Sequence, residues 1–170
     1  MEWGQQVKQG NEQALQSFYQ TTGNRFERVE RQSLIIDNVI GTGTTFNLSL
    51  HEPLKIDKLC DVFLDSFTTW DCLPSDAGGR MAFLLGIDEF NINSNSAGNS
   101  SVFNKVMIPN SATEADKTVT HKNKKFNYLC SINPTTISSV NGSITLIDGS
   151  STAFASGGRF IAELVFVARE

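Results

Sequence analysis

Short segments in which every second residue is apolar constrain the fold of this chain more than any other feature. In residues 44–50, Phe46, Leu48 and Leu50 alternate with polar residues. Side chains at every second position of a β-strand point to the same face, so the pattern predicts a strand covered on one side. Residues 125–132 repeat the alternation. The residues expected to point inward there are Phe126, Tyr128, Cys130 and Ile132.

From residue 25 onward the chain consists of apolar stretches bounded by Gly, Pro, Asn, Asp and Ser, and no segment sustains a helical period. The expected strands lie near residues 28–36, 44–50, 59–69, 81–93, 102–108, 117–132, 136–140 with 143–148, and 159–168. About eight strands without helices predict an all-β antiparallel sandwich, and the eight-stranded jelly roll is its common form. The 170-residue length fits one such domain over residues 25–170, preceded by a short N-terminal arm.

Three local details follow from the same reading. Asn141-Gly142 separates two apolar stretches and predicts a tight type I′ hairpin turn. In residues 81–92 the apolar positions change parity at Asp88-Glu89, which predicts a β-bulge. Uninterrupted alternation in residues 59–69 places four side chains on one face of that strand. They are Asp61, Phe63, Asp65 and Phe67.

Two segments are candidates for contacts with other subunits. Residues 160–168 are apolar at nearly every position, which predicts a central strand or one that lies under another subunit. Val165 and Val167 are its candidate assembly contacts. Residues 1–24 are rich in glutamine and form the arm, either a frayed or disordered leader or a segment that orders against a neighbouring subunit. Its candidate contacts are Trp3, Phe18 and Tyr19.

Composition excludes several classes of partner. The formal net charge of −4 and a pI near 5.2 do not favour binding to nucleic acid or to anionic membranes. No apolar run approaches the roughly 20 residues that a membrane span needs. The three cysteines, an odd number without metal-ligand spacing, are expected to be reduced thiols. The expected partners are therefore proteins.

The sequence does not indicate an enzyme, and we expect no catalytic, metal-binding or cofactor-binding residues. His51 and His121 lack further ligands at a recognisable spacing, so both are expected at the surface. His121 belongs to a basic cluster with lysines 122, 124 and 125 that would block edge pairing of strands. Asp88 and Glu89 are neighbours on the expected strand and would point to opposite faces, unlike the paired acids of a glycosidase.

Four blocks of the sequence resemble a known family. They are residues 61–69 (DVFLDSFTT), 83–92 (FLLGIDEFNI), 125–134 (KFNYLCSINP) and 159–166 (RFIAELVF). In order and spacing they are similar to blocks in the single-jelly-roll penton proteins of nucleocytoplasmic large DNA viruses. The resemblance covers residues 55–170. It implies a virion protein, assembled in the host cytoplasm, that forms homopentamers at the icosahedral vertices.

The same resemblance implies contacts with the double-jelly-roll major capsid protein and with minor capsid proteins. Other functions remain open at this stage. The chain could be a minor capsid protein beneath the shell, or a lectin-like or tumour-necrosis-factor-like binding module that uses the loops at residues 69–79 and 93–101. A jelly-roll hydrolase with scattered catalytic residues is a third class.

Overall fold

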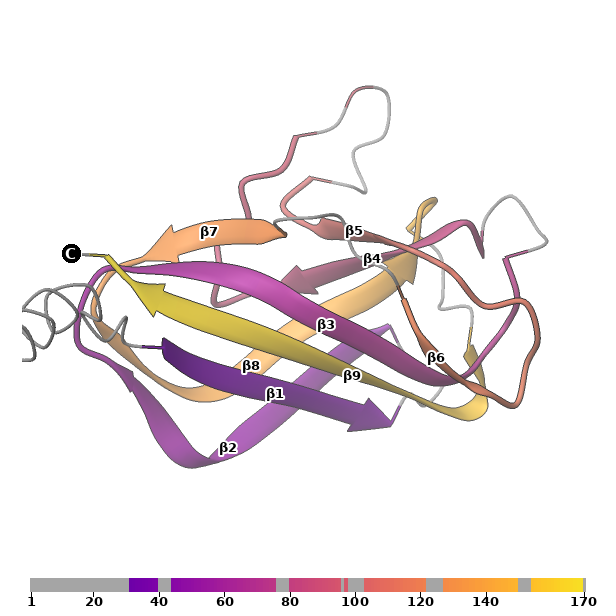
Figure 1. The fold of residues 1–170 in the computed structure, drawn as a ribbon, viewed down its shortest axis with the longest axis horizontal. Helices are drawn as coiled ribbons and strands as arrows, with labels where there is room; N and C mark the ends of the chain where they lie inside the picture. The colour runs from indigo at the N-terminus through magenta and orange to yellow at the C-terminus, as the bar shows by residue number, and fades with distance from the viewer. Residues whose placement is uncertain are drawn as a thin grey trace, which may run out of the picture. The chain divides into compact units, whose positions relative to one another are not determined.

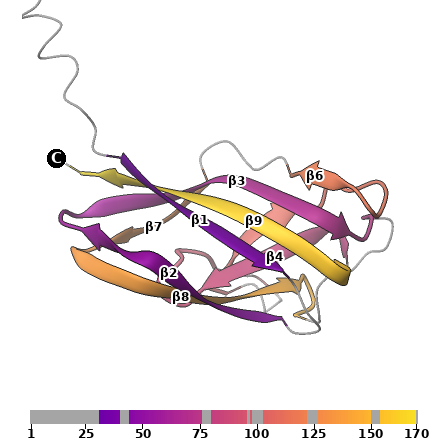
Figure 2. The same ribbon diagram turned by 90° about the horizontal axis from the view of Figure 1, so that it is seen from below.

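A computed structural model describes most of the chain. The described residues are 31–39, 44–75, 80–95, 97, 103–121, 127–149 and 154–169. The chain divides after Glu30 into two units, and all described residues belong to the second. Within this described part the regular elements are nine β-strands arranged as two antiparallel sheets (Figures 1 and 2). The prediction of an all-β sandwich of two antiparallel sheets is confirmed.

The first sheet has five strands. The edge strand β1 (Arg31–Val39) pairs with β9 (Phe154–Ala168), and β9 pairs with β3 (Cys60–Cys72). Two short strands, β6 (Thr118–Thr120) and β7 (Tyr128–Ile132), pair with the other edge of β3. β9 therefore lies in the centre of this sheet, as the apolar run at residues 160–168 predicted.

The second sheet has four strands. Their order is β2 (Thr45–Ile56), β8 (Thr135–Leu146), β4 (Ala82–Ile87) and β5 (Val106–Pro109). Figure 2 shows the two sheets as separate layers, with β1, β9 and β3 in one and β2 and β8 in the other. This arrangement leaves β1 and β2 at open edges on the same side of the sandwich.

The core lies between the sheets and is built largely from phenylalanine. The Phe67 ring stacks on that of Phe160 with centroids 5.7 Å apart, and Phe46 meets Phe160 edge-on at 5.5 Å. Phe67 and Phe160 have no exposed surface. Burying a side chain of this size contributes roughly 1.5–3 kcal/mol. The alternation predicted for residues 44–50 is confirmed, because Phe46 is buried and Leu48 and Leu50 are half-buried, while Asn47 and Ser49 are exposed.

The predicted hairpin at Asn141-Gly142 is wrong. β8 runs straight through these residues, and Gly142 lies opposite Phe46 of β2 and Ile87 of β4. A Cβ atom at position 142 would lie 2.2 Å from the carbonyl oxygen of Gly86 and 2.6 Å from Cζ of Phe46. Glycine is required here because backbone and ring approach closely, which is the other common reason for a glycine inside a strand.

The predicted bulge at Asp88-Glu89 is also wrong. β4 ends at Ile87, and the chain turns, with the Phe90 N–H donating to the Ile87 carbonyl at 3.1 Å. The change of parity noted in the sequence therefore marks the end of the strand. Phe90 still reaches the core, with only 1% of its surface exposed.

Bulges occur elsewhere and change which side chains face outward. In β3 the register against β9 shifts between Leu64 and Ser66, so Phe67 points into the core, not to the face of Asp61 and Phe63. In β7 the register against β3 shifts in the same way, and Tyr128 is 42% exposed. The expectations that Phe67 shares the face of Asp61 and that Tyr128 points inward are thus wrong, because each bulge reverses the alternation.

Candidate functional site

The side of the five-stranded sheet that faces away from the second sheet carries an unusual number of apolar residues. We call this side the outer face. Its apolar members are Ile35, Val39, Phe63, Trp70, Tyr128, Ile161, Val165 and Val167. Of the nine large apolar side chains that are exposed in the described part of the chain, five lie on this face. Such clustering on one face marks an interaction surface, whereas scattered exposed apolar residues do not.

The pairing of the strands brings these side chains together. Phe63 of β3 lies opposite Val165 of β9 on one side and Tyr128 of β7 on the other. The rings of Phe63 and Tyr128 meet edge-on with centroids 5.7 Å apart. Three neighbouring strands therefore contribute one continuous apolar row in the middle of the outer face.

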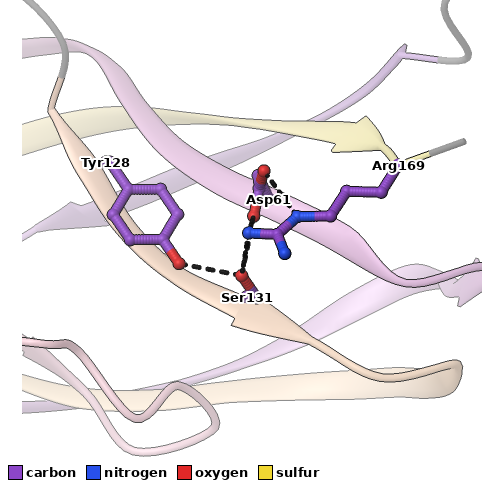
Figure 3. Close-up of polar contacts among 4 residues, drawn as sticks. All are labelled: Asp61, Tyr128, Ser131 and Arg169. Atoms are coloured by element: carbon purple, nitrogen blue, oxygen red, sulfur yellow. Dashed lines mark hydrogen bonds and ion pairs between the residues drawn. The ribbon is translucent and has the colours of Figure 1, made fainter.

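A polar network lies beside this row, at one end of the outer face (Figure 3). Arg169 donates from Nε and Nη2 to the two carboxylate oxygens of Asp61, at 2.9 and 2.6 Å. Ser131 donates to Asp61 Oδ1 at 2.7 Å and accepts from Arg169 Nη2 at 2.9 Å. Because the single Ser131 proton goes to Asp61, the Tyr128 hydroxyl is the donor in its 2.8 Å bond to Ser131.

An ion pair lies toward the opposite end of the outer face. Arg159 of β9 binds Asp37 of β1 through two nitrogens, and it lies directly between Val39 and Trp70 on the neighbouring strands. Hydrogen bonds from Arg159 and from Arg169 hold the pKa values of Asp37 and Asp61 below their usual range. Both carboxylates therefore stay charged at neutral pH, and the two ion pairs lie toward opposite ends of the outer face, with Glu163 of β9 between them.

The candidate assembly residues fall in two places. Val165 and Val167 lie on the outer face, half-buried between their neighbours. Trp3, Phe18 and Tyr19 lie outside the described residues, as does the whole 1–24 arm. Sequence reasoning missed Ile35, Trp70 and Tyr128, of which Ile35 is 62% exposed. The sequence did mark Ile35. Leu34, Ile35 and Ile36 are three consecutive apolar residues, whereas a strand covered on one face needs apolar residues only at every second position.

His121 is buried, contrary to the expectation that it lies at the surface. Its ring packs against Phe67 and Phe83, with centroids 5.6 and 5.1 Å away. The backbone N–H of Ser111 donates to Nδ1 at 3.0 Å, so the ring proton resides on Nε2, which donates to Thr69 Oγ1 at 2.7 Å. The loop that precedes β6 folds back over the ring, and the sequence does not mark that contact.

The groups around His121 are not suited to proton transfer or nucleophilic attack at neutral pH. Burial lowers the pKa of His121 to about 4, so the ring is neutral. The Thr69 hydroxyl donates to Cys72 Sγ at 3.1 Å, and burial raises the pKa of that thiol. The thiol is therefore protonated, whereas a nucleophilic cysteine needs the thiolate. The network holds β6 and its loop against β3.

Two of the acidic residues noted in the sequence, Glu89 and Asp61, make structural contacts. Glu89 accepts hydrogen bonds from the backbone N–H and the side-chain amide of Asn141, at 3.0 and 2.8 Å. It thereby fixes the end of β4 against the middle of β8. Asp61 belongs to the network of the outer face. In the described ranges, no three His, Cys, Asp or Glu side chains are grouped to hold a metal ion.

An open hollow of about 670 Å³ lies where the turn after β4 meets the connection between β7 and β8. Its lining is rich in hydroxyl and amide groups, including those of Asn91, Asn133, Thr135 and Ser138. Polar groups of this kind can hydrogen-bond a hydrophilic ligand. The hollow is shallow and most of these residues are exposed.

No protein-family model matches this chain, and no curated protein is significantly similar to it. Among the described residues, no helix is long and apolar enough to cross a membrane.

Proposed function

We propose that this chain is a structural virion protein, the penton protein that forms pentamers at the vertices of a large DNA virus capsid. The observation that carries the proposal is the outer face, on which apolar side chains from four neighbouring strands gather between two ion pairs, with Glu163 among them. Protein interfaces have this composition, with apolar and aromatic residues at the centre and polar residues at the rim. The proposal also draws on the four blocks of sequence that resemble penton proteins.

The strand order supports a jelly roll, the fold of that family. A jelly roll is a long antiparallel hairpin rolled into two sheets, so its strands pair in nested order. Here β1 pairs with β9, β2 with β8, and β4 with β5. β3 completes the series by pairing with β6 and β7 along one edge. If β6 and β7 are two halves of one interrupted strand, the roll has eight strands.

A ring of identical subunits needs two different patches on each subunit, joined head to tail. The outer face, with Val165 and Val167, is one proposed patch. The N-terminal arm, through Trp3, Phe18 and Tyr19, is the other. Burial of apolar surface drives the contact, at about 25 cal/mol per Å² before the costs of association are subtracted.

The remaining parts of the proposal follow from this role. The partners are other copies of the chain, the double-jelly-roll major capsid protein and minor capsid proteins, and not nucleic acid. The protein resides at the capsid vertex after assembly in the host cytoplasm. It is not an enzyme and requires no cofactor.

Native mass spectrometry of the purified full chain tests the proposal. We expect a pentamer, and we expect Val165→Asp to dissociate it because a charge then lies in the middle of the apolar row. Met107→Asp is the matched control, since Met107 is an exposed apolar residue on the second sheet. A chain that stays monomeric at high concentration, or that dissociates equally in both variants, contradicts the proposal.

The composition of purified virions separates the penton from its alternatives. A penton protein must be scarce beside the major capsid protein, whereas a minor protein beneath the shell follows the number of shell facets. A virion that lacks the chain contradicts both roles.

The hydroxyl-lined hollow beside Asn133 favours a second candidate, a lectin-like or tumour-necrosis-factor-like binding module. Binding of the monomer or trimer to a glycan array, abolished by Asn133→Ala, supports that alternative.

A further inference from the structure

The free edges of the two sheets differ in how they are protected. β1 pairs with β9 over all nine of its residues without a register shift, and Arg31–Val39 contains neither proline nor lysine. Its other edge pairs with no described strand. Ile35 and Val39 on this strand are more than 60% exposed. A long and regular edge of this kind, whose charged residues are Arg31 and the ion-paired Asp37, is a template for another strand.

The other edges carry the features that prevent such pairing. The ladder of β2 is interrupted between Ser49 and Leu54, a stretch that contains Pro53. β5 has four residues and ends at Pro109. β6 and β7 have three and five residues, and β7 is shifted in register. Among the described strands, only β1 presents an edge that is both long and unguarded.

A groove of about 380 Å³ lies beside this edge, between β1 and β2. Leu34 and Ile36 of β1 and Leu48, Leu50 and Leu54 of β2 line it. The interruption of β2 shapes the groove, because the four residues 50–53 lie opposite Ser138 of β8 alone. β2 thus follows a bent path at this open side of the sandwich (Figure 1).

We propose that the β1 edge and this groove bind an extended segment of a second copy of the chain, taken from the thirty residues that precede its β1. In such strand addition the main chain pairs with the edge, and alternate side chains occupy the groove. The side chains between them would extend the outer face beyond Ile35. The lining is mainly apolar, with Asp37, His51 and Glu52 among its polar members, and it therefore favours apolar side chains of the arm. Phe18 and Tyr19 are the candidates.

Chain length and symmetry support this occupant. Thirty extended residues span up to about 100 Å, enough to reach a neighbouring subunit from Arg31. Pairing of β1 with β1 of another copy is a two-fold contact, and a two-fold contact cannot link the subunits of a five-membered ring. An arm in a neighbour's groove is a head-to-tail contact, which can. The inference therefore rests on the proposed assembly and adds the β1 edge and its groove to the outer face as the surface that receives the arm.

Photo-cross-linking of the full chain tests this inference. Leu50 is replaced by p-benzoylphenylalanine, and isotopically heavy and light chains are mixed before assembly and irradiation. We expect peptides from residues 1–30 attached to position 50, in the mixed heavy and light pairs that random association produces. The same probe at Met107 should give no such peptides. Links found only within one chain, or links to β1 of another copy, overturn the inference.

The outcomes separate this inference from the proposed function. A wild-type pentamer without cross-links from position 50 to residues 1–30 overturns the inference alone. A chain that remains monomeric overturns both. Leu50→Lys, with Met107→Lys as its matched control, gives a second measure. We expect only the groove variant to lose the pentamer in native mass spectrometry, with both variants showing similar urea unfolding midpoints. A pentamer that survives Leu50→Lys unchanged also contradicts the inference.

Discussion

The two faces of the five-stranded sheet are made by the same strands, but only the inner face is covered by the second sheet. On β3, Phe67 points inward and has no exposed surface, while Trp70, three residues later, points outward and is 48% exposed. Inward side chains contact the second sheet of their own chain. Outward apolar side chains have no such layer over them in the described part of the chain. Under the proposed assembly, folding stability and association depend on different faces of one sheet.

The largest effect is expected from the inner face. Phe67→Ala removes a ring that packs on Phe83, Phe160 and His121, so we expect it to cost about 3–5 kcal/mol of unfolding free energy. Urea denaturation followed by circular dichroism measures this loss. Trp70→Ala, on the outer face of the same strand, should change the unfolding free energy by less than about 1 kcal/mol. Equal losses in the two variants would break the distinction between the faces.

The inner face should also control how stability depends on pH. The pKa of His121 is about 4 in the folded chain, against an ordinary value of 6.5. The unfolded chain therefore binds the proton more strongly, and stability falls as the pH is lowered from about 6.5 to about 4, by about 3 kcal/mol in total. The outer-face carboxylates Asp37 and Asp61 have pKa values lowered from 3.8, so they titrate only at pH values below this range.

Urea unfolding at a series of pH values between 7 and 4 checks this dependence. His121→Asn should be less stable than wild type at pH 7 but should lack this part of the pH slope, because no imidazole remains to be protonated. An identical slope in the wild type and the variant would show that other groups control it.

The outer face should instead control association. Trp70→Ala removes an exposed aromatic residue beside the Arg159–Asp37 pair, and aromatic residues dominate interface energies. We expect a loss of about 2 kcal/mol of association free energy, or about a 30-fold increase in the dissociation constant. Sedimentation over a range of concentrations measures it. An unchanged dissociation constant would mean that Trp70 lies outside the interface.

The smallest effect is expected from the polar border of that face. Asp61→Asn removes the charge that pairs with Arg169 but keeps one oxygen as an acceptor for Ser131. Exposed ion pairs contribute little to stability and are screened by salt. We expect a small drop in the unfolding midpoint at low ionic strength that disappears at high salt. A large drop that persists in high salt would show that the network acts as part of the core.

The sequence predicted those features that depend on one strand at a time. Alternation in residues 44–50 predicted that Phe46 is buried, and the apolar run at residues 160–168 predicted a central β9 carrying Val165 and Val167. These predictions succeed because alternation and apolar content are properties of a single segment.

Features that depend on two strands could not be predicted. The bulge between Leu64 and Ser66 is defined by pairing with β9, and it decides that Trp70 faces outward and Phe67 inward. Gly142 was interpreted as a turn residue because its neighbours Gly86 and Phe46 are distant in sequence. The burial of His121 follows from a folded-back loop, whereas its lysine neighbours indicated exposure.

The central position of β9 also determines when the five-stranded sheet can form. Arg31 of β1 lies opposite Val167, and Cys60 of β3 lies opposite Ala168, so nearly all described residues must be synthesised before either pairing is made. During translation β1 and β3 leave the ribosome early. Their apolar side chains stay exposed until β9, the strand that pairs with both, has been synthesised. Pairings between such distant residues fold slowly and leave the nascent chain prone to aggregation. Newly made protein should therefore depend on chaperones until β9 inserts between its two neighbours.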